Sequence, residues 1–129
     1  MFLPHVNDKG THQPWEYLPA SAGTYKVGQL LNMSGGKLAA LSAASKTTPP
    51  YLCQANITVE DGENVPVTRV TNDVIYETTL SAEAAGAAIG SKLEVTAGGL
   101  QADAAAAGTF ELVYVEGTAV GSVVRGRFV

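Results

Sequence analysis

Charge and long apolar runs are scarce in this chain of 129 residues. Charged side chains make up 16% of it, against about 25% in typical soluble domains, and a surface so poor in charge is typical of one covered by other protein. The net charge of −4 excludes the basic footprint that nucleic-acid binding requires. No stretch approaches the ~20 apolar residues of a membrane-spanning helix. We therefore expect neither nucleic acid nor a membrane among its partners.

Cysteine and histidine are also sparse. Cys53 is the only cysteine, so an internal disulfide is impossible. It lies in the strand-like run 51–55, where we expect a buried thiol that packs as a small apolar group. Both histidines, His5 and His12, lie within the first 23 residues, so the remainder has none for a Ser/His/Asp or Cys/His arrangement. The sequence therefore predicts that the protein is not an enzyme.

Two groups of side chains contain possible metal ligands. The first group is His5, Asp8, His12 and Glu16, which would meet only if their segment folded back on itself. The second group is Glu60, Asp61 and Glu63, which is more typical of a polar turn than of a cation site. We expect no metal and no cofactor at either place.

Residues 1–23 differ from everything that follows them. They hold the only tryptophan and three of the six prolines, and they show neither helical nor strand periodicity. We expect an extended N-terminal arm over 1–23 and a folded body over 24–129 that can fold without it. Within the arm, Pro14, Trp15 and Tyr17 have two interpretations. They cover one open end of the body, or they pair with the edge strand of a partner and fill its pockets.

The sequence of the body predicts short β strands separated by glycine turns. The run 25–33, the turn Ser34-Gly35-Gly36 and the run 37–41 predict a hairpin, and 74–80 is the strongest single strand. One short helix is expected from Ser81, which can cap it, to Gly86, which can end it. The expected fold is mainly β, a small and nearly closed β-barrel. The segment 89–100 repeats the pattern of 27–38, which predicts a second matching hairpin.

Several of these turn and strand signatures together resemble the head decoration (cement) proteins of tailed bacteriophages. The runs that carry the resemblance are 25–31, 36–38, 50–52, 65–70, 75–78 and 89–93. The resemblance implies a small β-barrel or β-tulip body that forms a homotrimer, with no catalytic residues. It also implies docking on the outer surface of the assembled capsid, a structural component of the virion made in the host cytoplasm.

The partner that the resemblance implies is the major capsid protein, whose strands would pair with the N-terminal arm. The protein would then bridge neighbouring capsomers and stabilise the head. The arm matches no motif of the family, so its contact residues are chosen for their side chains: Phe2, Leu3, Pro4, Pro14, Trp15 and Tyr17.

Two other functions stay open at the level of sequence. The first is another virion subunit, such as a tail-tube or connector protein, because such a subunit would be built from the same kind of short β strands. The second is a carbohydrate- or receptor-binding module that uses Trp15, Tyr51 and Tyr76 as a stacking platform. The module requires these aromatic side chains to gather on one exposed face, whereas Tyr51 and Tyr76 lie in apolar runs that more often face a core.

Overall fold

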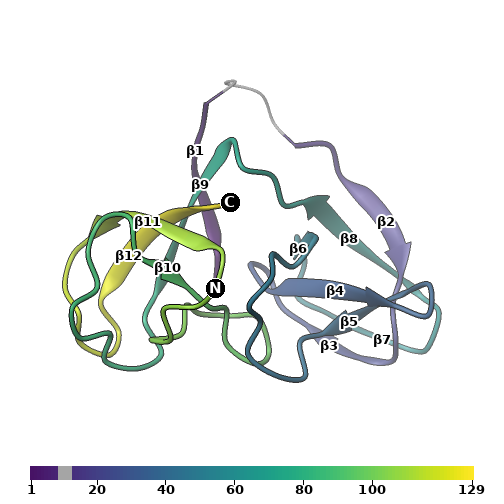
Figure 1. The fold of residues 1–129 in the computed structure, drawn as a ribbon. Helices are drawn as coiled ribbons and strands as arrows, with labels where there is room; N and C mark the ends of the chain where they lie inside the picture. The colour runs from purple at the N-terminus through teal and green to yellow at the C-terminus, as the bar shows by residue number, and fades with distance from the viewer. Residues whose placement is uncertain (9–12) are drawn as a thin grey trace.

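The structure, a computed structural model, describes residues 1–8 and 13–129, and in this part of the chain it is mainly β with no helix. Two five-stranded antiparallel sheets and a two-stranded ribbon make up the molecule (Figure 1). We call the first the terminal sheet, because it contains the strands nearest both ends of the chain. Its strands, in spatial order, are β1 (Leu3–Asn7), β9 (Val74–Thr79), β12 (Val123–Phe128), β11 (Phe110–Val115) and β10 (Lys92–Leu93).

The second, middle sheet is built from the central part of the chain. Its strands, in spatial order, are β2 (Glu16–Pro19), β8 (Asn64–Arg69), β6 (Tyr51–Cys53), β4 (Leu30–Ser34) and β5 (Lys37–Ala40). The ribbon pairs β3 (Gly23–Tyr25) with β7 (Ile57–Val59). The middle sheet and the ribbon lie on one side of the molecule in Figure 1, and the terminal sheet lies on the other.

Alternation of buried and half-buried side chains explains why β9 and β11 form strands. Along β9 the side chains of Val74, Tyr76 and Thr78 are buried, whereas the residues between them are half-buried. Along β11, Phe110 and Leu112 point inward in the same way. A period of two puts alternate side chains on opposite faces of a strand, so such a segment covers a core with one face.

Two apolar cores result, and the middle sheet separates them. The first core contains four aromatic rings of the terminal sheet and its N-terminal neighbour: Phe2, Tyr76, Phe110 and Phe128. The consecutive residues Leu30 and Leu31 of β4 face different cores, as do Leu52 and Tyr51 of β6. The second core lies on the ribbon side of the middle sheet. Because Leu30 and Leu31 of β4 and all of β6 are covered on both faces, these residues are apolar rather than alternating.

The predicted hairpin of β4 and β5 is confirmed, with a shorter first strand. Strand β4 begins at Leu30, and Tyr25 belongs to the ribbon instead. Gly35 and Gly36 both have positive φ angles, of 58° and 78°, which is the backbone that a two-residue hairpin turn requires. The second, matching hairpin over 89–100 does not form. Its only strand is the two-residue β10, followed by isolated bridges at Val95.

The short helix expected from Ser81 to Gly86 does not form. The amide of Ser81 donates to the carbonyl of Ala102, and the amide of Ala84 donates to the carbonyl of Thr118. These long-range bonds use donors at the start of the expected helix, and the side chain of Ala84 packs into the first core. A single helical turn fixes several dihedral angles for one hydrogen bond, so tertiary contacts readily override it.

The expected barrel is also corrected, because the sheets do not close. Strands β1 and β10 are the edges of the terminal sheet, and β2 and β5 are the edges of the middle sheet. The chain crosses from one sheet to the other between β8 and β9. Among the described residues no strand ladder joins the two sheets, although residues outside the strands bond across, as Ser45 and Val95 do.

The N-terminal segment, which we define as residues 1–8 and 13–19, does not extend away from the body as expected. Strand β1 pairs with β9, and β2 pairs with β8. The segment therefore runs antiparallel to the chain 64–77 and adds one strand to each sheet (Figure 1). The physical reason is that Phe2 fills the first core, and its burial ties β1 to β9. The division of function between 1–23 and 24–129 stays a prediction.

Candidate functional site

The two strands of the N-terminal segment occupy comparable places in the two sheets. Strand β1 is an outer edge of the terminal sheet, and β2 is an outer edge of the middle sheet. Within its bounds each strand pairs on one side only, which leaves backbone donors and acceptors on its other side. Directly after β2, Ala20 bridges to Leu38 of β5, so the open part of this edge is β2 itself. The structure thus places most of the expected contact residues along two strand edges.

One of the expected contact residues, Phe2, does not lie on the surface. The side chain of Phe2 is 0% exposed, and its ring lies 5.4 Å from that of Phe110 in an edge-to-face arrangement. A second ring, that of Phe128, is 6.0 Å away. Phe2 therefore belongs to the first core and has no surface for a partner.

The other five residues are exposed, and we call them the edge surface: Leu3, Pro4, Pro14, Trp15 and Tyr17. Tyr17 lies within β2 and is 63% exposed, and Trp15 lies directly before β2 and is 54% exposed. Such exposure is unusual for large aromatic side chains, which dominate cores and interfaces when they are covered. On β1, Leu3 and its neighbour Val6 are also exposed.

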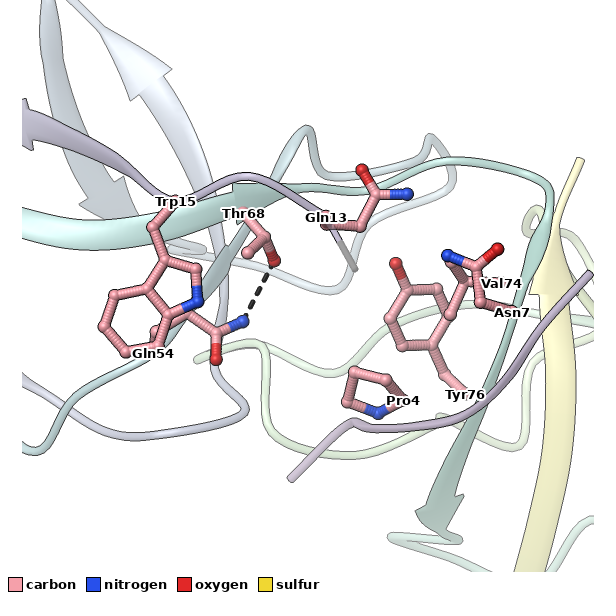
Figure 2. A pocket seen from close by; sticks show the side chains of 8 residues that line it. All are labelled: Pro4, Asn7, Gln13, Trp15, Gln54, Thr68, Val74 and Tyr76. Carbon is pink, nitrogen blue, oxygen red and sulfur yellow. Dashed lines mark hydrogen bonds between the residues drawn. The ribbon is translucent and has the colours of Figure 1, made fainter. Parts of the chain in front are cut away.

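A pocket of about 190 Å³ lies beside the edge surface, at the junction of the two sheets (Figure 2). Its lining residues come from both strands of the N-terminal segment and from the chain behind them: Pro4, Asn7, Gln13, Trp15, Gln54, Thr68, Val74 and Tyr76. None of these residues carries a formal charge at neutral pH. The lining therefore carries no charge of its own, and it includes three carboxamide side chains.

Hydrogen bonds fix part of the pocket wall. Gln54 donates from Nε2 to Oγ1 of Thr68 at 2.9 Å, as Figure 2 shows, and Gln13 donates from Nε2 to Oγ1 of Thr71 at 3.2 Å. On the opposite wall, burial raises the pKa of Tyr76 to about 12, although a hydrogen bond with the Thr71 backbone opposes the shift. Tyr76 is therefore a neutral hydroxyl at any physiological pH.

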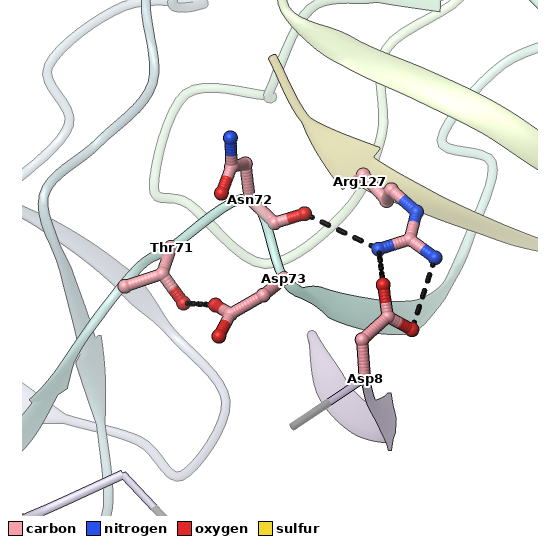
Figure 3. Close-up of polar contacts among 5 residues, drawn as sticks. All are labelled: Asp8, Thr71, Asn72, Asp73 and Arg127. Atoms are coloured by element: carbon pink, nitrogen blue, oxygen red, sulfur yellow. Dashed lines mark hydrogen bonds and ion pairs between the residues drawn. The ribbon is translucent and has the colours of Figure 1, made fainter. Parts of the chain in front are cut away.

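An ion pair holds the end of β1 against the C-terminal strand (Figure 3). Arg127 of β12 donates from both terminal nitrogens to the carboxylate of Asp8, at 2.6 and 3.2 Å. It also donates to the carbonyl oxygen of Asn72 at 3.3 Å. The hydrogen bond from Arg127 lowers the pKa of Asp8 below its usual value. Beside this pair, Thr71 donates to the carboxylate of Asp73.

A second arginine holds β2. Arg69 of β8 donates to both carboxylate oxygens of Glu16, at 2.8 and 3.2 Å, and its guanidinium lies 5.4 Å from the centre of the Tyr51 ring. The hydrogen bond to Glu16 raises the pKa of Arg69. Two-pronged arginine–carboxylate pairs favour one geometry. Each strand of the N-terminal segment therefore has one such pair to the body.

Among residues 1–8 and 13–129, no three His, Cys, Asp or Glu side chains gather in a way that would hold a metal. His12, one of the candidate ligands, lies outside the described residues. In the acidic turn, Asp61 forms an ion pair with Lys37 at 2.6 Å, and Glu63 accepts from the amide of Glu60. Residues 1–8 and 13–129 contain no helix long and apolar enough to cross a membrane.

The thiol of Cys53 lies in the second core, as expected from its strand-like surroundings. Burial raises its pKa, and its sulfur donates to the carbonyl oxygen of Ala55 at 3.2 Å. A raised pKa keeps the thiol protonated and therefore weakly nucleophilic at neutral pH.

The stacking platform of three aromatic residues does not form. Tyr51 faces the second core and Tyr76 faces the first, on opposite sides of the middle sheet. Only Trp15 and Tyr76 line the same pocket. Sequence reasoning missed Gln54 and Thr68, because ordinary polar residues in and beside strands carry no signal until the fold places them beside Trp15.

Comparison with protein-family models finds no matching family, and comparison with curated proteins finds no match.

Proposed function

We propose that this protein is a head decoration (cement) protein of a tailed bacteriophage. It binds the outer surface of the assembled capsid through the edge surface and bridges neighbouring capsomers. The observation that supports this proposal best is the pair of exposed aromatic side chains, Trp15 and Tyr17, at an unpaired sheet edge.

The edge position supports recognition by strand addition. A partner strand that pairs with β1 or β2 satisfies backbone groups that water otherwise satisfies, and it places its side chains beside those of the edge surface. Pro4 in β1 and Pro19 in β2 each lack a backbone donor. Proline at an edge restricts which strands can pair there, so these positions favour a specific partner over indiscriminate association.

The aromatic side chains support affinity. Tryptophan and tyrosine are over-represented among residues whose truncation weakens protein interfaces most. Docking would cover the large exposed areas of Trp15 and Tyr17, and the apolar side chain of Leu3 would add to the buried area.

The position of the two strands supports bridging. Because β1 and β2 belong to different sheets, one molecule presents two edges, and these can contact two capsid subunits. A homotrimer would multiply these contacts, since several weak contacts on one oligomer reinforce each other. Sedimentation of the purified protein tests this part, with a compact trimer as the expected result. Rings or tubes would contradict it and favour a tail component.

Capsid binding is tested by co-sedimentation with expanded heads assembled from the major capsid protein of the same phage. The double variant Trp15→Ala/Tyr17→Ala should bind at least about tenfold more weakly, since hot-spot truncations cost about 2 kcal/mol or more. Ile89→Ala/Val120→Ala is the matched control, because both of its side chains are more exposed still, at 75% and 67%. Equal binding by the two double variants would overturn the proposed surface.

A further inference from the structure

We propose that the pocket at the junction of the two sheets binds one neutral pyranose ring, either a free monosaccharide or the terminal unit of a glycan. The pocket shares Pro4 and Trp15 with the edge surface, so one molecule binds either a capsid or a sugar at this place, and a molecule that is free of the capsid can contact a sugar-coated surface. Four features of the pocket support the inference: its size, its lack of charge, its carboxamides and its aromatic wall.

The size of the pocket selects a small ligand. Its volume of about 190 Å³ is below the ~300 Å³ at which pockets for drug-sized molecules begin. One pyranose ring fits this scale, whereas an extended oligosaccharide or a peptide would have only one unit inside. The rest of a glycan would then lie outside the pocket, along the half-exposed Trp15.

The absence of charge selects a neutral ligand. None of the eight lining residues carries a formal charge at neutral pH. An anion or a cation that entered the pocket would lose hydration without gaining an opposite charge, which is unfavourable. Phosphate, sulfate and sialic acid are therefore poor ligands for it, and a neutral sugar loses no charge solvation.

The carboxamides match the chemistry of sugar hydroxyls. A hydroxyl both donates and accepts hydrogen bonds, and a carboxamide offers two N–H donors and a carbonyl acceptor. The bond from Gln54 to Thr68 uses one donor of Gln54. The same holds for Gln13, which donates to Thr71. These bonds fix both side chains, so that their other polar atoms are held in place for a ligand.

The indole of Trp15 in the pocket wall matches the apolar faces of a pyranose ring. A pyranose has C–H groups on its faces, and these pack against an indole as other apolar groups do. Trp15, 54% exposed, lies beside Gln54 and Thr68 in the pocket wall, and Pro4 lies on the other side (Figure 2). A ring seated against the indole would have its edge hydroxyls within reach of the carboxamides.

The test is titration of the full chain with neutral sugars, followed by the fluorescence of Trp15, the only tryptophan. The probes are glucose, galactose, mannose and N-acetylglucosamine, each as the monosaccharide and at the non-reducing end of a disaccharide. A saturable change with at least one probe is expected. Binding of the monosaccharide indicates a site for free sugar, and binding of the disaccharide alone indicates a glycan end; both support the pocket.

A matched pair of variants ties the signal to the pocket. Gln54→Ala should weaken binding about tenfold, because the loss of one well-placed hydrogen bond to a ligand has an effect of this order. Gln101→Ala is the control and should leave binding unchanged. Gln101 is also half-buried and donates from Nε2 to a threonine Oγ1, that of Thr79 at 3.0 Å, but it lies outside the pocket. Trp15→Leu, measured by calorimetry, should abolish binding.

Three results would overturn the proposal. One is no saturable signal with any neutral probe, and another is preferential binding of sialic acid. The third is equal weakening by Gln54→Ala and Gln101→Ala. Because Gln54 is not part of the edge surface, its variant should still bind capsids, and the two proposals can fail separately.

Discussion

Phe2 and Leu3 are neighbours in the sequence with opposite surroundings. Phe2 is inside the first core among the rings of Phe110 and Phe128, whereas Leu3 is 42% exposed on the outer face of β1. Phe2 precedes β1 and points into the core, whereas β1 is exposed from Leu3 to Val6. The two residues therefore contribute to different properties, Phe2 to stability and Leu3 to the edge surface.

We predict that Phe2→Ala lowers the free energy of unfolding by about 3 kcal/mol, because truncating a buried phenylalanine removes apolar burial and leaves a cavity. Leu3→Ala, the control beside it, should change it by less than about 0.5 kcal/mol, as exposed substitutions do. Urea denaturation followed by fluorescence measures both values. Equal effects would contradict the burial of Phe2.

A second prediction at this scale concerns pH. The pKa of Asp8 is lowered in the folded protein by its hydrogen bond from Arg127, although the nearby Asp73 opposes the shift. A lowered carboxyl pKa contributes stability above the unfolded value, and this contribution is lost as pH falls through the folded value. We therefore expect Asp8→Asn to reduce the loss of stability on acidification, in urea titrations at a series of pH values.

The carboxyl resonance of Asp8 provides a direct check on the same prediction. In an NMR titration it should have a midpoint below the usual range of an aspartate, and Arg127→Gln should move that midpoint upward. A midpoint that stays the same in Arg127→Gln would show that the ion pair is not responsible.

At the scale of elements, the segment 96–101 replaces the second hairpin that the repeated pattern predicted. Instead of forming its own strand pair, this segment packs against β4. The amide of Leu30 donates to the carbonyl of Gly99 at 2.8 Å, and Gln29 donates from Nε2 to the carbonyl of Gly98 at 2.9 Å. The two similar sequence patterns therefore contact each other, and only the first is a hairpin.

This packing predicts different outcomes for two adjacent glycines. Both have positive φ, 83° at Gly98 and 76° at Gly99, so alanine has a similar backbone cost at each. A Cβ at Gly99 would lie 2.2 Å from the carbonyl oxygen of Leu30, whereas one at Gly98 would meet no atom within 4 Å. We expect Gly99→Ala to be less stable than Gly98→Ala by about 2 kcal/mol in urea denaturation. Equal stabilities would show that the contact is absent.

Strand β8 is a second element whose place the tertiary structure decides. Pro66 indicates an edge strand or a late start, because it cannot donate to a ladder, yet β8 lies between β2 and β6. The ladder between β6 and β8 ends at the pair Cys53 and Val67. Pro66 follows just beyond it and accepts from the amide of Gln54, so its missing N–H falls where the ladder has ended.

At the scale of the whole molecule, the N-terminal segment connects the two sheets. It adds an outer strand to each, and one arginine–carboxylate pair holds each strand. The chain crosses between the sheets a second time from β8 to β9, alongside it. The first core, which contains Phe2 and side chains from both sheets, and bonds such as that from Leu30 to Gly99 also hold the two sheets together.

Removal of residues 1–7 should accordingly destabilise the entire protein. We predict a fall in Tm of about 10 °C or more, since a loss of about 3 kcal/mol has this effect in a domain of this size. Removal of Val129, which is exposed at the other end, should leave Tm nearly unchanged in the same calorimetric measurement. An unchanged Tm after removal of 1–7 would show that the body folds independently of this segment, as the sequence predicted.

The sequence by itself determined the β class, the hairpin of β4 and β5, and the alternation of β9 and β11. These features depend on local periods and on glycine turns, which neighbouring residues specify. Only the tertiary structure decided that Phe2 is a core residue, that β1 and β2 join different sheets, and that Gln54 faces a pocket beside Trp15. These strands pair because pairing buries apolar surface between segments that lie 45 or more residues apart. No local pattern records this long-range competition.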